Sequence, residues 1–183
     1  MRWAVALLAV AVAISLAGCG SSKSSSSGDP TMGGADTNPV EATAEQVGTA
    51  LLERVDVGRH EGFDRVVFQF ENVRPGYKIA YVDRPIVEDG SGATVDVAGD
   101  AVLLIRMEPA SGFDLATDEG RLVYKRPRRI DGSASGASIV RELVRTGDFE
   151  AVLSWAIGLD KQADFRVRTL DDPARIVVDV RTA

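Results

Sequence analysis

The sequence predicts an all-β domain, a β-sandwich of short antiparallel strands with one short α-helix. The first observation is a strand period, as in residues 64–71, where Val66, Phe68 and Phe70 fall on one face and Val67 on the other. The second is that turn signals rich in glycine, proline and aspartate separate such runs at short intervals, which is typical of sandwiches and barrels. The third is that a single segment breaks this period.

The expected strands follow from the alternation of apolar and polar residues. In "FRVRTL", for example, Phe165 and Val167 alternate with Arg166 and Arg168. In chain order, the expected strands are residues 51–57, 64–71, 76–83, 93–97, 101–107, 121–125, 150–159, 165–170 and 175–180. Turn signals stand between them at residues 74–76, 88–92, 98–100 and 171–173.

Residues 138–147, "SIVRELVRTG", form the segment that breaks the strand period. Ser138 is a suitable N-cap, Ile139 and Leu143 are spaced as on one helix face, and Gly147 suits the position after a helix end. Because so short a helix is marginal alone, it must pack on the sheets. We therefore expect a helix that forms a lid over one open end of the sandwich.

An apolar run near the N-terminus predicts export. Residues 4–17 are almost entirely apolar. This run is too short for a bilayer core of about 30 Å but fits the hydrophobic region of a secretory signal. The motif Leu16-Ala17-Gly18-Cys19 resembles the lipobox of bacterial lipoprotein signals, which implies cleavage before Cys19 and a diacylglycerol on its sulfur. The alternatives are an ordinary secreted protein and an uncleaved anchor.

The chain divides into three parts. Residues 1–18 are the expected signal peptide, residues 19–47 a lipidated cysteine with a flexible tether rich in serine and glycine, and residues 48–183 the sandwich domain. Because Cys19 is the only cysteine, the domain must fold without disulfides. Acyl chains on Cys19 would attach the protein firmly to a membrane, at the outer face of the cytoplasmic membrane.

Composition argues against several kinds of function. The formal charge of −6 becomes −7 once Arg2 leaves with the signal, which argues against nucleic acid as a partner. A hydrolytic zinc site needs three ligands and a base, whereas the mature chain has one histidine and one cysteine that is expected to be lipidated. The sequence contains no glycine loop that cradles phosphates. We therefore expect no metal and no cofactor.

Serine hydrolase chemistry has two weak candidates. His60 lies near Asp64, which permits a Ser–His–Asp arrangement; the alternative is a polar hairpin in which both side chains bond the backbone of the turn. The loop at residues 132–136 has alanine where a nucleophile elbow needs serine. The sequence therefore favours a protein that is not an enzyme.

The densest positive segment of the chain is "YKRPRR". Its Arg126, Arg128 and Arg129 can bind carboxylates or phosphates bidentately, with Tyr124 alongside. The alternative is a solvated loop that neutralises acidic residues close by. Trp155 lies within an expected strand, so it is either a core residue or a platform on which a sugar stacks. These five side chains are the candidate ligand-binding residues.

The whole domain is similar to a known family. The most specific segments are "GFDRVVF" at residues 62–68, "WAIGLD" at 155–160 and "LDDPARIVVDV" at 170–180, within a similarity that covers about residues 50–183. They resemble the AMIN-like domain of actinobacterial lipoproteins, a relative of the AMIN domain found beside cell-wall amidases and secretins. The resemblance implies a β-sandwich that targets or binds peptidoglycan and performs no chemistry. AMIN domains usually accompany an enzyme or pore domain, and this chain departs from that pattern.

Two main hypotheses for the function follow. The first is a non-catalytic, membrane-anchored module of the cell envelope that binds peptidoglycan or an envelope assembly partner. The second is a carrier that holds a lipid or another small molecule in an apolar cleft beneath the helix; a hydrolase centred on His60 is a distant third. A buried pocket would favour the carrier. A shallow groove lined by arginines and aromatic rings would favour the wall-binding module.

Overall fold

The computed structural model describes residues 32–116 and 118–183, and the regular structure in this part of the chain is entirely β-strand. The expected signal, Cys19 and the first part of the tether lie outside the described residues. Within them, no helix is long and apolar enough to cross a membrane. The strands are β1 (Val40–Ala42), β2 (Ala50–His60), β3 (Phe63–Phe70), β4 (Gly76–Val82), β5 (Ala101–Glu108), β6 (Ala110–Ser111), β7 (Phe113–Asp114), β8 (Arg121–Leu122), β9 (Arg129–Asp131), β10 (Val140–Phe149), β11 (Val152–Leu159), β12 (Phe165–Asp171) and β13 (Ala174–Arg181).

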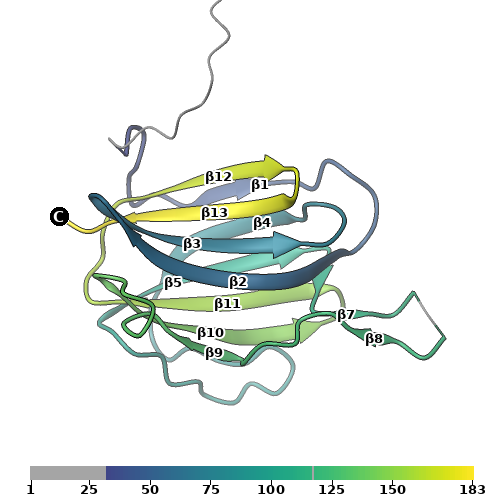
Figure 1. Ribbon diagram of the computed structural model, residues 1–183. Coiled ribbons are helices and arrows are strands. Elements are labelled where there is room, and N and C mark those ends of the chain that lie inside the picture. The colour runs from purple at the N-terminus through teal and green to yellow at the C-terminus, as the bar shows by residue number, and fades with distance from the viewer. Residues whose placement is uncertain (1–31, 117) are drawn as a thin grey trace, which may run out of the picture.

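Two sheets form the body of the domain (Figure 1). One has six strands in the order β1-β4-β5-β11-β10-β9, and the other has five in the order β12-β13-β3-β2-β6. Neighbouring strands are antiparallel except for β2 and β6, which pair in parallel. The β7–β8 hairpin projects from one end of the sandwich (Figure 1). The expected all-β sandwich is confirmed.

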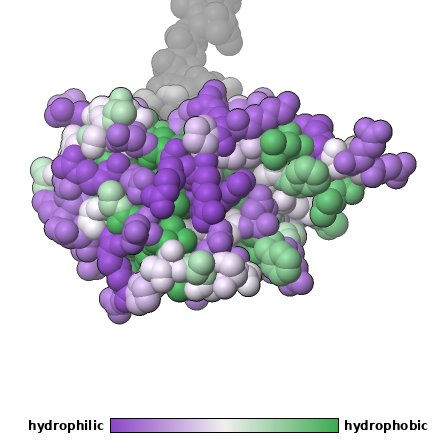
Figure 2. Space-filling model, turned by 90° about the horizontal axis from the view of Figure 1, so that it is seen from below, coloured by the Kyte–Doolittle hydropathy of each residue, from purple (hydrophilic) through white to green (hydrophobic). Residues whose placement is uncertain are grey.

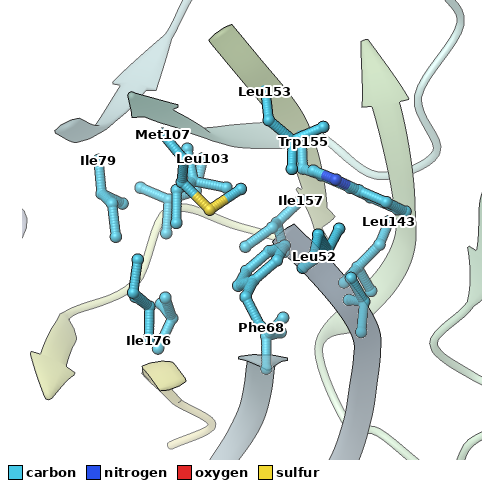
Figure 3. Packing of buried hydrophobic residues seen from close by; sticks show 14 of the residues in the cluster. Leu52, Phe68, Ile79, Leu103, Met107, Leu143, Leu153, Trp155, Ile157 and Ile176 are labelled. Atoms are coloured by element: carbon cyan, nitrogen blue, oxygen red, sulfur yellow. The ribbon is translucent and has the colours of Figure 1, made fainter. Parts of the chain in front are cut away.

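The inner faces of the two sheets enclose one large hydrophobic core (Figure 3). Trp155 of β11 meets Phe68 of β3 edge to face, with ring centroids 6.1 Å apart. Leu143 of β10 and Ile176 of β13 enter the same core from opposite sheets. Each fully buried side chain of this size contributes about 1.5–3 kcal/mol. A core of this extent is the main source of stability for a domain that must fold without disulfides.

The six-stranded sheet is covered on both of its faces. The connection between β4 and β5 crosses its outer face and packs Ile86, Val95 and Val97 against Ala156 of β11 and Val144 of β10. Because β11 is buried on both sides, its sequence is apolar apart from Ser154 and does not alternate. The outer face of the five-stranded sheet carries polar side chains such as Arg65, Gln69 and Asp179 beside Val67 and Val177.

The expected helix at residues 138–147 is wrong, because most of this segment forms strand β10. Two β-bulges interrupt its pairing with β11, one between Val140 and Glu142 and the other between Arg145 and Gly147. A bulge inserts an extra residue into one strand, so the apolar side chains lose their period of two. The resulting spacing of apolar residues along β10 resembles that of a helix. Accordingly, the described residues form neither a helical lid nor a cleft beneath one.

Most expected strands are confirmed, with two exceptions. Residues 121–125 form strand only at their first two positions, in β8, before the chain turns toward the core. Residues 93–97 are not a strand and form only an isolated bridge between Val87 and Thr94. Val95 and Val97 of this segment stand at alternate positions because both pack on the outer face of the six-stranded sheet. The segment itself does not pair as a strand of that sheet.

A buried carboxylate connects the two sheets. Asp64 of β3 is completely buried, and it points into the interior instead of bonding the hairpin backbone as expected. Its Oδ2 accepts hydrogen bonds from the main-chain N–H groups of Ser138 (2.7 Å), Ile139 (2.7 Å) and Val140 (3.1 Å). These donors lie where β10 of the six-stranded sheet begins. Three donors on this oxygen offset part of the cost of burying the side chain, whose other oxygen, Oδ1, has no hydrogen-bond partner among the described residues.

Replacing Asp64 with alanine leaves these N–H groups without their acceptor in the interior. We expect the free energy of unfolding to fall by about 3 kcal/mol or more. Asp64→Asn should cost less, because its amide oxygen still accepts from the same donors. Urea denaturation of residues 20–183 measures both, with Glu61→Ala, in the exposed turn of the same hairpin, as the control. Equal stability of Asp64→Ala and the control would show that the carboxylate does not join the sheets.

Candidate functional site

The arginines of the basic segment, residues 124–129, pair with acidic residues of the domain itself. The ion pairs are Arg126 with Asp56 (3.2 Å), Arg128 with Glu88 (2.7 Å) and Arg129 with Glu142 (2.8 Å). Asp56 belongs to the five-stranded sheet and Glu142 to the six-stranded sheet, so the segment ties the two sheets together along one edge. These acids are distant in the sequence rather than adjacent to the segment. The three arginines of the segment are therefore already engaged within the domain.

Tyr124 and Trp155 lie together in the core. Trp155 has no exposed surface and Tyr124 is 2% exposed, and their rings meet edge to face with centroids 5.4 Å apart. The Tyr124 hydroxyl donates a hydrogen bond to the carbonyl of Pro127 (3.1 Å). Burial raises the pKa of Tyr124 to about 12. Because a ligand cannot reach either ring, neither serves as the expected contact, and Trp155 takes the core role that the sequence also allowed.

The β2–β3 hairpin does not bring a catalytic group together. His60 ends β2, and its ring stacks on Phe63 with centroids 5.0 Å apart. Asp64 points to the interior, where its Oδ2 is bonded to the main chain of another segment, so the two side chains do not form the pair that serine chemistry needs. Among the described residues, no group of three or more His, Cys, Asp or Glu side chains is placed to hold a metal ion.

The outer face of the five-stranded sheet carries a different group of arginines. Across β12, β13 and β3, Arg166 is paired with Asp179, and Asp179 is paired with Arg65. Arg168 stands two residues further along β12 and therefore on the same face. Phe165, the residue before Arg166, lies on the opposite face of the strand and points into the core. Strand pairing thus places three guanidinium groups around one carboxylate, and we call this group the arginine face.

Asp179 is completely buried beneath the three arginines of this face. Arg65 donates to it bidentately, from Nε to Oδ1 (2.6 Å) and from Nη2 to Oδ2 (3.0 Å). Arg166 and Arg168 donate to Oδ2 at 3.2 Å and 3.1 Å. Burial raises the pKa of Asp179, but the hydrogen bond from Arg65 and the neighbouring positive charges outweigh burial, so the pKa lies below its usual value. With Asp179 ionised, three guanidinium groups surround one buried carboxylate on this face.

An aromatic ring supports the arginine face. The guanidinium carbon of Arg65 lies 5.0 Å from the ring centroid of Phe63, and that of Arg166 lies 5.9 Å from it. The side chains of Arg65 and Arg168 remain 25% and 35% exposed. Asp179 occupies two of the five N–H donors of Arg65 and one of those of Arg168. The group is therefore fixed in position and can still donate to an anion from solvent.

The sequence contained a signal for part of this group. Arginine stands at alternate positions of "FRVRTL", so the strand period alone places Arg166 and Arg168 on one face. Arg65 is separated from Asp179 by 114 positions, and only strand register brings it there. Along the chain, positive charge is densest in the basic segment. The arginines of the arginine face come together only across neighbouring strands of the sheet, so the linear sequence does not reveal them as a group.

The fold and this surface define an all-β sandwich domain with a cationic sheet face. The family model of the AMIN-like domain matches residues 50–182, and the chain belongs to the AMIN-like domain family. The expected resemblance to that domain is confirmed, and the link to actinobacterial lipoproteins stays a prediction. Neither the curated proteins nor the solved structures contain a match to the chain.

Asp179→Asn removes the charge that holds the three guanidinium groups together. We expect it to lower the free energy of unfolding at pH 7 by about 3 kcal/mol. The carboxylate stabilises the fold fully above the pKa of an unfolded aspartate, about 3.9, and this contribution is lost as the pH falls through the lower folded pKa. The difference between parent and variant should therefore persist from neutral pH to about pH 4 and shrink in stronger acid.

Thermal unfolding at a series of pH values measures this difference. Glu41→Gln is the control, because Glu41 is an exposed carboxylate that pairs with Lys78 at 3.6 Å, and exposed pairs contribute about 0–1 kcal/mol. A stability difference for Asp179→Asn that is the same at every pH would contradict the assignment of the effect to the ionised carboxylate.

Proposed function

We propose that this protein is a lipid-anchored protein of the cell envelope, at the outer face of the cytoplasmic membrane, whose sandwich domain binds peptidoglycan and catalyses no reaction. The observation that carries the proposal is the arginine face. Three guanidinium groups share one carboxylate on an exposed face of an otherwise acidic protein. A group of guanidinium groups fixed on one sheet face favours an anionic ligand.

Peptidoglycan supplies anions of the right kind. Its stem peptides carry carboxylates, and polymers attached to the wall add phosphates, both of which guanidinium groups bind bidentately. Each such charge-assisted contact contributes roughly 1.5–3 kcal/mol, less where salt screens it. Because an acidic protein is repelled by an anionic wall, a local positive face is required for binding. The arginine face meets this requirement better than the basic segment, whose three arginines already pair with three different acids.

Membership of the AMIN-like family supports a binding function, because such domains are generally non-catalytic binding modules. The expected anchor supports a place in the envelope, where a lipid on Cys19 and a tether would keep the domain close to the wall. The carrier hypothesis has lost its basis, since the segment thought to cover the cleft is strand β10. The hydrolase hypothesis is equally weakened by the separation of His60 from Asp64.

Binding to purified sacculi tests the arginine face. Residues 20–183 are mixed with sacculi and the bound fraction is pelleted at several concentrations. Arg166→Gln/Arg168→Gln should weaken binding about tenfold or more, because two of the three cations are lost. Arg65 still pairs with Asp179 in this variant, so the fold is expected to survive. Added salt should weaken binding by the parent.

Arg128→Gln/Arg129→Gln is the matched control, since it changes the net charge by the same amount. Loss of binding in the arginine-face variant alone supports the proposal. Loss in the control alone would move the site to the basic segment, and equal loss in both would mean that only net charge matters. Sacculi freed of phosphate-bearing polymers distinguish recognition of carboxylates from recognition of phosphates.

The anchor is tested separately with Cys19→Ser. We expect this variant to leave the membrane fraction when cells are fractionated without detergent, because its sulfur can no longer carry acyl chains. Ser22→Ala, close by in the tether, is the control and should stay with the membrane. Membrane association of Cys19→Ser equal to that of the parent would mean that the apolar run at residues 4–17 is retained as an anchor.

A further inference from the structure

A pocket of about 850 Å³ opens at the end of the sandwich from which the β7–β8 hairpin projects. We call it the end pocket. Figure 2 shows hydrophobic side chains gathered beside this hairpin. The lining includes Leu51 from β2, Phe113 and Leu115 from the hairpin, and Phe149 from the end of β10. None of the residues of the arginine face lines it.

The polar groups of the end pocket mostly hold its shape. Asn72 accepts a hydrogen bond from the N–H of Leu51 (3.0 Å) and donates one to the carbonyl of Thr49 (3.0 Å). Asp148 accepts a hydrogen bond from the hydroxyl of Ser111 (2.8 Å). These bonds connect the floor of the pocket to its walls, so the hollow is preformed. A partner would gain mainly from the apolar surface that remains uncovered.

That apolar surface is unusually exposed. Leu115 is 82% exposed and Phe149 is 58% exposed, and they stand on the two elements that form the walls. Phe149 is presented by a tight turn in which Glu150 and Ala151 have φ values of 50° and 60°. Exposed apolar side chains on both sides of a hollow are typical of a surface that another molecule covers.

The charge around the end pocket is negative. Its lining contains Asp114, Asp148 and Glu150 and no lysine or arginine. Arg121 pairs with Asp114 (3.3 Å) and Arg145 with Asp148 (3.5 Å), both from outside the lining. Glu150 makes no ion pair among the residues that the structure describes. An apolar ligand that carries a positive charge therefore fits this surface, whereas an anionic lipid headgroup would be repelled.

We propose that the end pocket docks a segment of another protein that presents an aliphatic or aromatic side chain next to a lysine or arginine. The exposed walls argue against a small molecule, because such a site would leave much of the ligand in contact with water. A protein segment brings its own surface to cover Leu115 and Phe149 while its anchoring side chain fills the hollow. This site is separate from the proposed wall-binding face, so one domain can hold the wall and a protein partner together.

Selection from a random-peptide library displayed on phage tests the proposal. The bait is residues 20–183, which contain every described residue. We expect enriched peptides to combine a large apolar residue with a neighbouring lysine or arginine. A synthetic copy of an enriched peptide should bind Leu115→Ser/Phe149→Ser about tenfold more weakly than the parent. Glu150→Gln should weaken binding by a smaller factor and reduce its dependence on salt.

Leu170→Ser is the matched control, because Leu170 is an exposed leucine at the other edge of the five-stranded sheet. It should leave peptide binding unchanged. The proposal is overturned if no peptide is enriched, if enriched peptides lack basic residues, or if the double variant binds as tightly as the parent. Self-association of the parent that the double variant abolishes would instead assign the pocket to a second copy of the chain. Sacculus binding should be the same in parent and double variant, which separates this test from that of the arginine face.

Discussion

The buried carboxylate of Asp64 is the constraint on which the relative placement of the two sheets depends. Burial of apolar surface holds the sheets together, but that attraction has little directional preference. Three hydrogen bonds to one oxygen do have a direction, and they require β10 to begin at one position beside β3. The pairing of β10 with β11 then places Trp155 in the core and Phe149 at the end pocket.

Arginine has two different roles in this domain, because one group of arginines pairs with separate acids and the other group pairs with the same acid. In the basic segment the three arginines pair with three different acids, of which Asp56 also pairs with Arg54, and these pairs fasten the edges of the sheets. On the sheet face, Arg65, Arg166 and Arg168 all pair with Asp179. This group of guanidinium groups is held in place by the fold rather than assembled by a ligand. Such preorganisation lowers the cost of binding an anion.

The two proposed binding surfaces differ in chemistry and position. The arginine face is cationic and lies on a broad sheet face, which suits an extended anionic polymer. The end pocket is apolar with an acidic lining and lies beside the β7–β8 hairpin, which suits a protein segment that carries a positive charge. These opposite requirements mean that the two ligands would not compete. In the proposed function, the domain joins the wall to a partner while the lipid on Cys19 keeps it near the membrane.

The sequence by itself determined the strand content and most strand positions, because the apolar period in segments such as residues 64–71 depends only on neighbouring residues. It also determined the family, through the specific segments at residues 62–68, 155–160 and 170–180. It could not determine that residues 140–149 form a strand, since two bulges disturb that local period. It also could not pair Arg65 with Asp179 or Arg128 with Glu88. Those contacts, and the end pocket with them, were decided by tertiary structure alone, because they depend on the register of strands and the packing of loops that are far apart in the chain.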